Sequence, residues 1–444
     1  MRIQLSDHFT YKKLLRFVLP SITMMIFTSI YSVVDGLFVS NFVGKTPFAA
    51  INLIMPVLTI LSSIGLMIGA GGTAIVGKTL GENDRERASK YFSMLVYVVA
   101  AIGVVFGLIG FFAMRPLAML LGAEGIMLND CVLYGRVFVL VMPFQMLQMS
   151  FQSFFVTAEK PKLGLATTVI AGVSNIILDT LFIVVIPWGL LGAAFATAIS
   201  QVLGAVIAIV YFGRKNDSLL RLTTKTKLYG KVLLKSCTNG SSEMVSNVAN
   251  SVVSMLYNYQ LMRFAGENGV AAYGVTMYVS FIFAAIFFGY SMGCAPIISY
   301  QFGAENHSGL KNMFRKSMVL MAATGITMLL FVIVAAAPLS KIFVGYDQEL
   351  YDMTVHAFKI FAASFLIMGI STFASAFFTA LNDGKVSAII AFLRTLVFNV
   401  LTILIIPQLF GLNGVWWAVV VAEIASFIVS IAFLILKRKK YRYA

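Results

Sequence analysis

Five ionisable side chains lie inside long apolar stretches of this 444-residue sequence, where a charge is costly and is therefore a candidate for function. They are Asp35, Asp179, Glu243, Arg394 and Glu423. Carboxylates in such surroundings bind protons or cations, and a cation there pairs with a carboxylate. These residues are therefore the first candidates for ion-binding chemistry.

Asp35 and Asp179 have the neighbours expected of an ion site. Asn175 precedes Asp179 by four residues, so both lie on one helix face, and Thr197 adds a hydroxyl from the next apolar stretch. Asp35 has no cation within four residues in sequence. Two carboxylates, an amide oxygen and a hydroxyl are hard oxygen ligands for a bare cation, and two nearby carboxylates without a cation would share a proton. The alternative is that Asp179 only bonds a neighbouring helix.

The other three residues lie in the second half of the chain. Arg394 and Glu423 fall near the middle of adjacent apolar stretches, which predicts a buried ion pair, with a structural brace as the simpler interpretation. Glu243 lies in the polar stretch 239–247, which is typical either of a wet cavity or of polar packing between helices. Pro20 removes a backbone hydrogen bond from the first apolar stretch, which predicts a hinge, unless it serves packing alone.

The composition indicates a membrane protein. Hydrophobic residues make up 59% and charged residues 11%, against about 45–50% and about 25% in soluble domains. The net charge of +15 comes from Lys and Arg in short loops, a distribution typical of membrane proteins, so we expect no nucleic-acid partner. Three cysteines and three histidines are scattered, which argues against a zinc site or a disulfide framework.

Apolar stretches long enough to cross a bilayer, about 20 residues, predict an all-α integral membrane protein. The twelve stretches are residues 14–40, 49–76, 91–114, 132–158, 164–186, 190–212, 233–262, 270–301, 313–337, 354–381, 386–406 and 414–436. Of the 33 Lys and Arg residues, 26 fall on the side of the termini, 6 on the other side, and Arg394 inside a span. The excess predicts that both termini are cytoplasmic.

The sequence repeats at half its length. Short motifs recur at offsets of 222, 222, 220 and 222 residues, which pair Gly81 with Gly303, Thr157 with Thr379, Ile186 with Ile406 and Gly192 with Gly414. Each half has six spans and inserts with the same orientation, so the repeat is parallel. We predict an N-lobe over residues 1–213, a cytoplasmic linker over 214–227, and a C-lobe over 228–444 with a basic tail.

With these features the chain resembles the MATE family, the multidrug and toxic compound extrusion transporters. The resemblance covers nearly the whole chain. Its local matches are the end of the first span at residues 35–39, the Gly81-Glu82-Asn83 loop with its echo at Gly303, and Asn175-xxx-Asp179 with Thr197.

The resemblance implies roles for individual residues. In the family an N-lobe site of this kind binds Na⁺ or H⁺, and Asp35, Asn175, Asp179 and Thr197 match its positions one by one. Pro20 matches the family proline that is proposed to bend when the aspartate is protonated. Some members also carry an acidic pair in spans 7 and 10. Span 10 has no mid-span carboxylate here, so we place coupling in the N-lobe.

The implied activity is secondary active multidrug efflux at a bacterial plasma membrane. Lipophilic, cationic compounds would leave in exchange for H⁺ or Na⁺ by alternating access between two six-helix lobes. Asp35 and Glu243 are the candidates for contact with substrate in the cavity. The resemblance also implies a monomer whose partners are small substrates and membrane lipids, with no cofactor other than the coupling ion.

Three rival functions are weighed against this one. A flippase for lipid-linked sugars, from the same superfamily, would need several Arg or Lys inside the N-lobe spans to hold a pyrophosphate, and only Arg136 approaches that. A membrane enzyme is disfavoured because no HExxH motif and no Asp/His cluster lies within the spans. A channel is disfavoured because no repeated filter loop is evident.

Overall fold

The computed structural model describes residues 3–345 and 347–444, and within these residues the regular structure is helical without a β-strand. The segments are, in chain order, α1 (Tyr11–Phe38), η1 (Val39–Val43), α2 (Lys45–Gly81), α3 (Arg85–Leu120), α4 (Gly125–Leu140), α5 (Met142–Thr157), α6 (Pro161–Asp179), η2 (Thr180–Val185), α7 (Leu190–Gly213), α8 (Gly230–Gly303), α9 (His307–Val344), α10 (Gln348–Ala380), α11 (Gly384–Phe392), η3 (Leu393–Phe398) and α12 (Asn399–Tyr441). The three η segments are π-helical.

The described helices are long enough to cross a membrane many times. Nine are long and apolar enough to span, and α4 with α5, bent by 58°, brings the number to ten. Two of the nine break at a glycine in the left-handed region, Gly266 with φ 60° and Gly411 with φ 58°. The count reaches the predicted twelve only when each side of these glycines is taken as a separate span. The predicted all-α membrane fold is confirmed.

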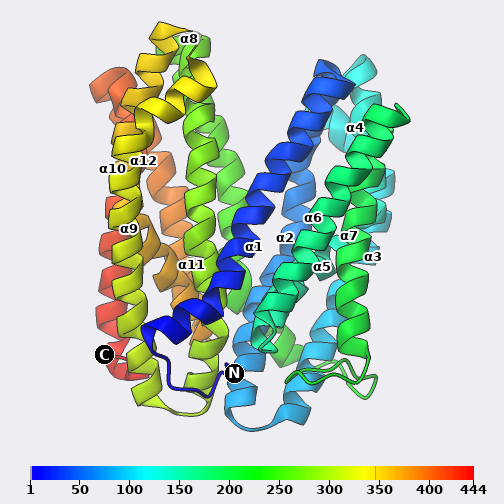
Figure 1. Ribbon diagram of the computed structural model, residues 1–444, viewed down its shortest axis with the longest axis vertical. Helices are drawn as coiled ribbons and strands as arrows, with labels where there is room; N and C mark the ends of the chain where they lie inside the picture. The colour runs from blue at the N-terminus through cyan, green and yellow to red at the C-terminus, as the bar shows by residue number, and fades with distance from the viewer. Residues whose placement is uncertain (1–2, 346) are drawn as a thin grey trace.

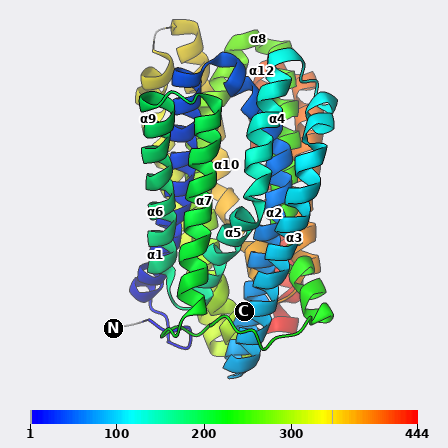
Figure 2. The same ribbon diagram turned by 90° about the vertical axis from the view of Figure 1, so that its right-hand side faces the viewer.

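The helices form two groups that meet at one end of the molecule. Figure 1 shows the first group, α2 to α7, on one side, the second group, α8 to α12, on the other, and α1 inclined between them. The groups approach each other at the end that carries both termini and separate toward the opposite end. In the second view, α4 lies toward the open end and α5 toward the termini (Figure 2). Apolar side chains on the outer surface, such as Val334 with 80% exposure, suit contact with lipid.

The turns that follow α2 and α8 have the same backbone structure, which explains the repeat seen in the sequence. Asn83 and Glu305, 222 residues apart, both have positive φ, 61° and 53°. In each turn the next side chain caps the following helix: Asp84 accepts from the Arg87 amide at 2.9 Å, and Asn306 accepts from the Gly309 amide at 2.9 Å. The shared motif therefore encodes a helix end, a left-handed residue and an N-cap.

At the end near the termini, α2 packs against α8 through glycines. A methyl group added at Gly71 would overlap the carbonyl oxygen of Ser236, and one added at Gly240 would overlap that of Met67. The two helices therefore touch backbone to backbone, a distance that only glycine permits. Asn382 strengthens the contact between the two groups, because its Nδ2 donates to the Ala74 carbonyl at 2.9 Å.

The chain start contacts both groups of helices: the Leu5 amide donates to Glu159 Oε1 in the turn between α5 and α6 at 2.7 Å, and two further bonds link it to the second group. Gln301 Nε2 donates to the Leu5 carbonyl at 3.0 Å, and Asn312 Nδ2 donates to the Phe9 carbonyl at 3.0 Å. Within α1, Val18 packs against Gly293. Further along α1, Phe27 and Tyr31 pack over Gly172 of α6, in the first group. The helix therefore passes from one group to the other, and Pro20 lies near the crossing.

The α2–α8 contact leads to a stability prediction. Gly71→Ala places a methyl group against a backbone carbonyl that cannot rotate away, so we expect it to destabilise the fold by about 1–3 kcal/mol, as overpacking does. The measurement is thermal unfolding of the purified protein in detergent.

Gly274→Ala on α8, the partner helix of the contact, is the matched control, because nothing lies within 4 Å of a methyl group added there. That change should be neutral or should stabilise the folded protein by roughly 0.5–1 kcal/mol, because a glycine within a helix costs about that much relative to alanine. Equal melting temperatures for the two variants would contradict the proposed tight contact.

Candidate functional site

Two carboxyl groups face each other in the first group of helices. Asp35 lies on α1, three residues before its end, and Asp179 is the last residue of α6. The two carboxyl groups lie close enough to interact directly. Each is followed by a π-helical segment, η1 or η2, and such segments are frequent at functional sites. The structure thus brings together two residues that are 144 positions apart in the sequence.

Several polar side-chain atoms of this cluster are buried and, within the described part of the chain, make no hydrogen bond that meets the usual geometry. They comprise Asp35 Oδ1, both carboxylate oxygens of Asp179, the Oδ1 and Nδ2 atoms of Asn175, and Thr197 Oγ1. Leaving a buried polar group without a hydrogen bond costs about 1–3 kcal/mol. The donor set is two carboxylates and two neutral oxygens, which suits a hard cation such as Na⁺ or a shared proton.

Transition metals are a poorer fit. The described residues contain no group of three or more His, Cys, Asp or Glu side chains that could hold a metal ion. Ligands for transition metals are usually imidazole or thiolate groups, which the Asp35–Asp179 cluster lacks.

The structure adds three polar residues to the four that the sequence indicated. Tyr31 lies beside Gln201, and Tyr134 lies beside Thr197 and near both carboxyl groups. Tyr31 precedes Asp35 by four residues, and Gln201 follows Thr197 by four, so this spacing on one helix face could have predicted both. Tyr134 comes from α4, and nothing in its local sequence indicates that it joins the site.

A cavity of about 310 Å³ lies between the two groups of helices. From α1 it is lined by Met25, Thr28 and Ser29, and α2, α5, α8, α10, α11 and η3 supply the rest. Its wall combines apolar side chains, among them Phe281, Phe288 and Met292, with polar ones, among them Asn247, Asn250, Glu243 and Arg394. This volume and this mixture suit a small amphipathic ligand.

Charges in the cavity come from the second group of helices. Arg394 Nε lies 3.2 Å from Glu423 Oε1 and 3.3 Å from Oε2, and both side chains are largely buried, with 11% and 5% exposure. The Glu243 carboxylate lies near enough to Arg394 to feel its charge. Arg394 lies in the π-helical segment η3, and Asn399 Nδ2 donates to its carbonyl at 2.8 Å.

The charged side chains of Arg394, Glu423 and Glu243 do not balance one another. One guanidinium faces two carboxylates, and Glu423 holds the closer position. Glu243 therefore presents a carboxylate to the cavity that is only partly balanced by a cation. Asp35 is not among the described residues that line the cavity. It lies six residues beyond Ser29 on α1, about 9 Å along the helix axis.

The family profile named MatE matches residues 20–181 and 244–405, one segment in each half of the chain. The chain belongs to the MatE family. Curated relatives of this MatE protein include the multidrug export proteins MepA of Staphylococcus saprophyticus, 25% identical over 97% of this chain and 94% of the relative, and of Staphylococcus haemolyticus, 26% identical over 94% and 93%.

Solved structures share the fold of this MatE protein. One is an outward-facing multidrug resistance MATE transporter of the MOP superfamily, with 20% identity, a TM-score of 0.92 and 98% coverage of both chains. Another is a MOP superfamily transporter from Pyrococcus furiosus, with 21% identity, a TM-score of 0.90 and 98% coverage of both chains. The multi-pass membrane architecture follows from the family and from the apolar helices.

The Arg394–Glu423 pair of this MatE protein leads to a second stability prediction. Arg394→Gln leaves Glu423 as a buried charge without its closest partner, so we expect a loss of about 3–5 kcal/mol. The double variant Arg394→Gln/Glu423→Gln removes both charges and should recover most of that loss. Thermal unfolding in detergent measures both effects.

Arg115→Gln, a change of the same type at an exposed residue of α3, serves as the control and should leave the melting temperature nearly unchanged. If Arg394→Gln unfolds at the same temperature as the wild type, or if the double variant is no more stable than the single one, the pair does not brace these helices.

Proposed function

We propose that this MatE protein is a secondary active multidrug efflux antiporter. It exports lipophilic, cationic compounds across a bacterial plasma membrane in exchange for H⁺ or Na⁺. The observation that carries the proposal is the Asp35–Asp179 pair, whose buried oxygens have no fixed cation beside them in the described chain, next to a cavity between two groups of helices. The multidrug export function named for its MepA relatives supports the same assignment.

The coupling ion binds at the carboxylate pair. Two carboxylates held together repel each other, and either a shared proton or a bound cation relieves the repulsion. Asp35 and Asp179 supply the charge, and Asn175 and Thr197 complete the shell with neutral oxygens. For Na⁺ these four residues are the ligands. For H⁺ the proton is shared between the two carboxylates, and Asn175 Nδ2 and the Thr197 hydroxyl can donate to the remaining carboxylate oxygens.

The substrate binds in the cavity between the groups. Aromatic and methionine side chains there accept varied apolar shapes, and the partly balanced Glu243 carboxylate attracts a cation. A cationic, lipophilic compound satisfies both parts of the wall. A neutral or anionic compound would gain nothing from Glu243.

Transport proceeds by alternating access. The α2–α8 glycine contact closes the end that carries the termini, and the two groups of helices separate toward the other end (Figure 1). The excess of Lys and Arg near the termini supports a cytoplasmic position for that closed end, and the arrangement is then outward-facing. Pro20 is the hinge at which α1 bends as the two groups move. The ion and the substrate drive transport by favouring opposite states.

The coupling site is tested by dye efflux. Cells that express Asp35→Asn should lose most of the gradient-driven ethidium efflux of the wild type, because the substitution keeps the shape but removes the ion-binding charge. The measurement is ethidium efflux from energised cells at equal expression, with the proton gradient and the Na⁺ gradient collapsed separately. The gradient whose loss stops wild-type efflux identifies the ion.

Asp130→Asn, which removes a carboxylate from α4 outside the cluster, is the control and should transport normally. Full efflux by Asp35→Asn would refute the proposed coupling site. If the wild type moves no dye under either gradient, the multidrug assignment fails, and lipid-linked substrates are the next class to examine.

The substrate site is tested by neutralising Glu243. Glu243→Gln should raise the KM for ethidium about tenfold or more, which corresponds to one charge-assisted interaction of about 1.5 kcal/mol or more. The ion that drives transport should stay the same, because the carboxylate pair is intact. Efflux rates over a series of dye concentrations give KM and kcat separately.

A neutral lipophilic dye is the matched control, since its KM should not respond to the change. If both dyes lose affinity equally, Glu243 shapes the cavity and its charge does not select the substrate.

A further inference from the structure

A basic pocket of about 430 Å³ lies at the end of the molecule near the termini, apart from the cavity between the groups. The first turns of α3 supply Arg85 and Lys90, and the segment between α7 and α8 supplies Arg221 and Lys225. Glu86, Ser89 and Thr223 complete the lining. Four cations against one carboxylate give the pocket a net positive charge.

Hydrogen bonds hold the segment between α7 and α8 against α3 and so give the pocket its shape. The Thr223 amide donates to Ser93 Oγ at 2.9 Å, and Thr226 Oγ1 donates to the Lys90 carbonyl at 2.8 Å. Tyr97 also bonds this segment, with its hydroxyl 3.3 Å from the Thr223 carbonyl. Arg221 and Lys225 are thereby fixed opposite the start of α3.

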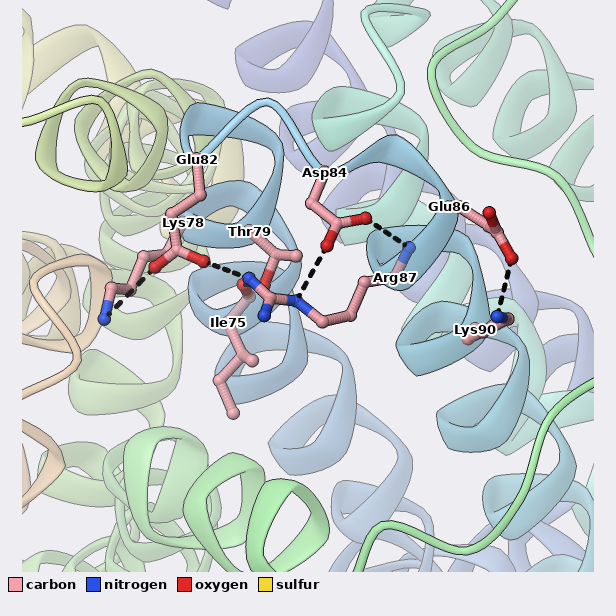
Figure 3. A network of polar contacts seen from close by, with 8 residues as sticks. All are labelled: Ile75, Lys78, Thr79, Glu82, Asp84, Glu86, Arg87 and Lys90. Carbon is pink, nitrogen blue, oxygen red and sulfur yellow. Dashed lines mark hydrogen bonds and ion pairs between the residues drawn. The ribbon is translucent and has the colours of Figure 1, made fainter.

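The acidic residues near the pocket already have cationic partners. Figure 3 shows Arg87 turned toward Glu82 and Asp84. Lys78 also lies 3.6 Å from Glu82.

The one acidic residue that lines the pocket is paired as well. Glu86 bonds Lys90 at 2.6 Å (Figure 3). In the described chain, Arg85, Arg221 and Lys225 form no ion pair within 4.0 Å. These three cations remain available to an anion from outside the protein.

The pocket continues into an apolar surface along α3. Tyr97, Val104 and Leu108 are 44%, 50% and 58% exposed, and their spacing puts them on the helix face that also carries Lys90. A cation cluster at the membrane surface above an apolar strip matches both parts of an anionic phospholipid. Arginine suits phosphate because its guanidinium donates two parallel hydrogen bonds.

We propose that this pocket binds the phosphate of an anionic phospholipid, whose acyl chains lie along α3. Basic pockets at the cytoplasmic ends of membrane helices commonly hold such headgroups. The bound lipid would bridge α3 and the segment that joins the two halves of the chain. The proposal does not depend on the proposed transport function, because it concerns lipid binding alone.

The test compares the triple variant Arg85→Gln/Arg221→Gln/Lys225→Gln with a control of equal charge, Arg16→Gln/Lys311→Gln/Arg315→Gln. The control residues are exposed on α1 and α9 and also lack ion pairs in the described chain. Native mass spectrometry would count phosphatidylglycerol molecules retained by the purified full-length protein, and thermal unfolding in phosphatidylcholine nanodiscs with and without phosphatidylglycerol would show the stabilisation.

We expect the wild type and the control to retain the lipid and to be stabilised by it. The pocket variant should bind it about tenfold or more weakly, since each basic residue near an anionic surface changes affinity by about fivefold. Equal loss in both triple variants, or no lipid effect on the wild type, would overturn the proposal. Equal stabilisation by inorganic phosphate alone would assign the pocket to a free anion and overturn the lipid assignment.

Discussion

The backbone of α2 touches the backbone of α8 at glycines, and the arrangement of both groups of helices depends on that contact. Gly81 lies against the Tyr300 carbonyl, and Gly303 lies against the Lys78 carbonyl. The two contacts are related by the repeat, because 81 and 303 differ by the same 222 positions as 78 and 300. One approximate two-fold axis therefore runs through the closed end. The glycines that mark the repeat in the sequence are the residues that let the two halves meet there.

In the proposed alternating-access cycle the two halves move relative to each other, and α1 is the element that must adapt, because it contacts both of them. The segment just before it is bonded to residues of α8 and α9 through the Leu5 and Phe9 carbonyls. The later part of α1 packs on α6 through Tyr31 and carries Asp35. Any rotation of one half against the other must bend or slide this helix. Pro20 lies between the two attachments, where a missing backbone hydrogen bond makes bending least costly.

Much of this fold was predictable because membrane spans leave a strong signal in sequence. Apolar length gave the spans, and the motif after α2 and α8 gave the repeat. The bend at Val141 between α4 and α5 was not predicted, although Pro143 follows it closely. The π-helical segments could not be predicted, because they depend on tertiary packing. The position of residues 3–18 against the second group could not be foreseen either, since their sequence neighbours belong to the first.

The candidate ion site shows a similar division. Asn175 and Asp179 share a helix face by spacing alone, and the same rule relates Tyr31 to Asp35 and Thr197 to Gln201. Spacing cannot show that the three faces converge, and it cannot supply Tyr134 from α4. Those contacts arise where helices that are far apart in the sequence pack against one another. Whether these residues bind the coupling ion stays a prediction.

The separation of the two charged sites constrains how coupling can work. Asp35 and Asp179 lie outside the cavity lining, whereas Glu243 and Arg394 belong to it. A substrate in the cavity and an ion at the carboxylate pair therefore need not displace each other by contact. In the proposed antiport, their competition would pass through states of the protein that each one favours. Helix α1 is common to both sites, with Thr28 and Ser29 in the cavity wall and Asp35 at the pair. A change in its bend is thus the shortest physical link between ion and substrate.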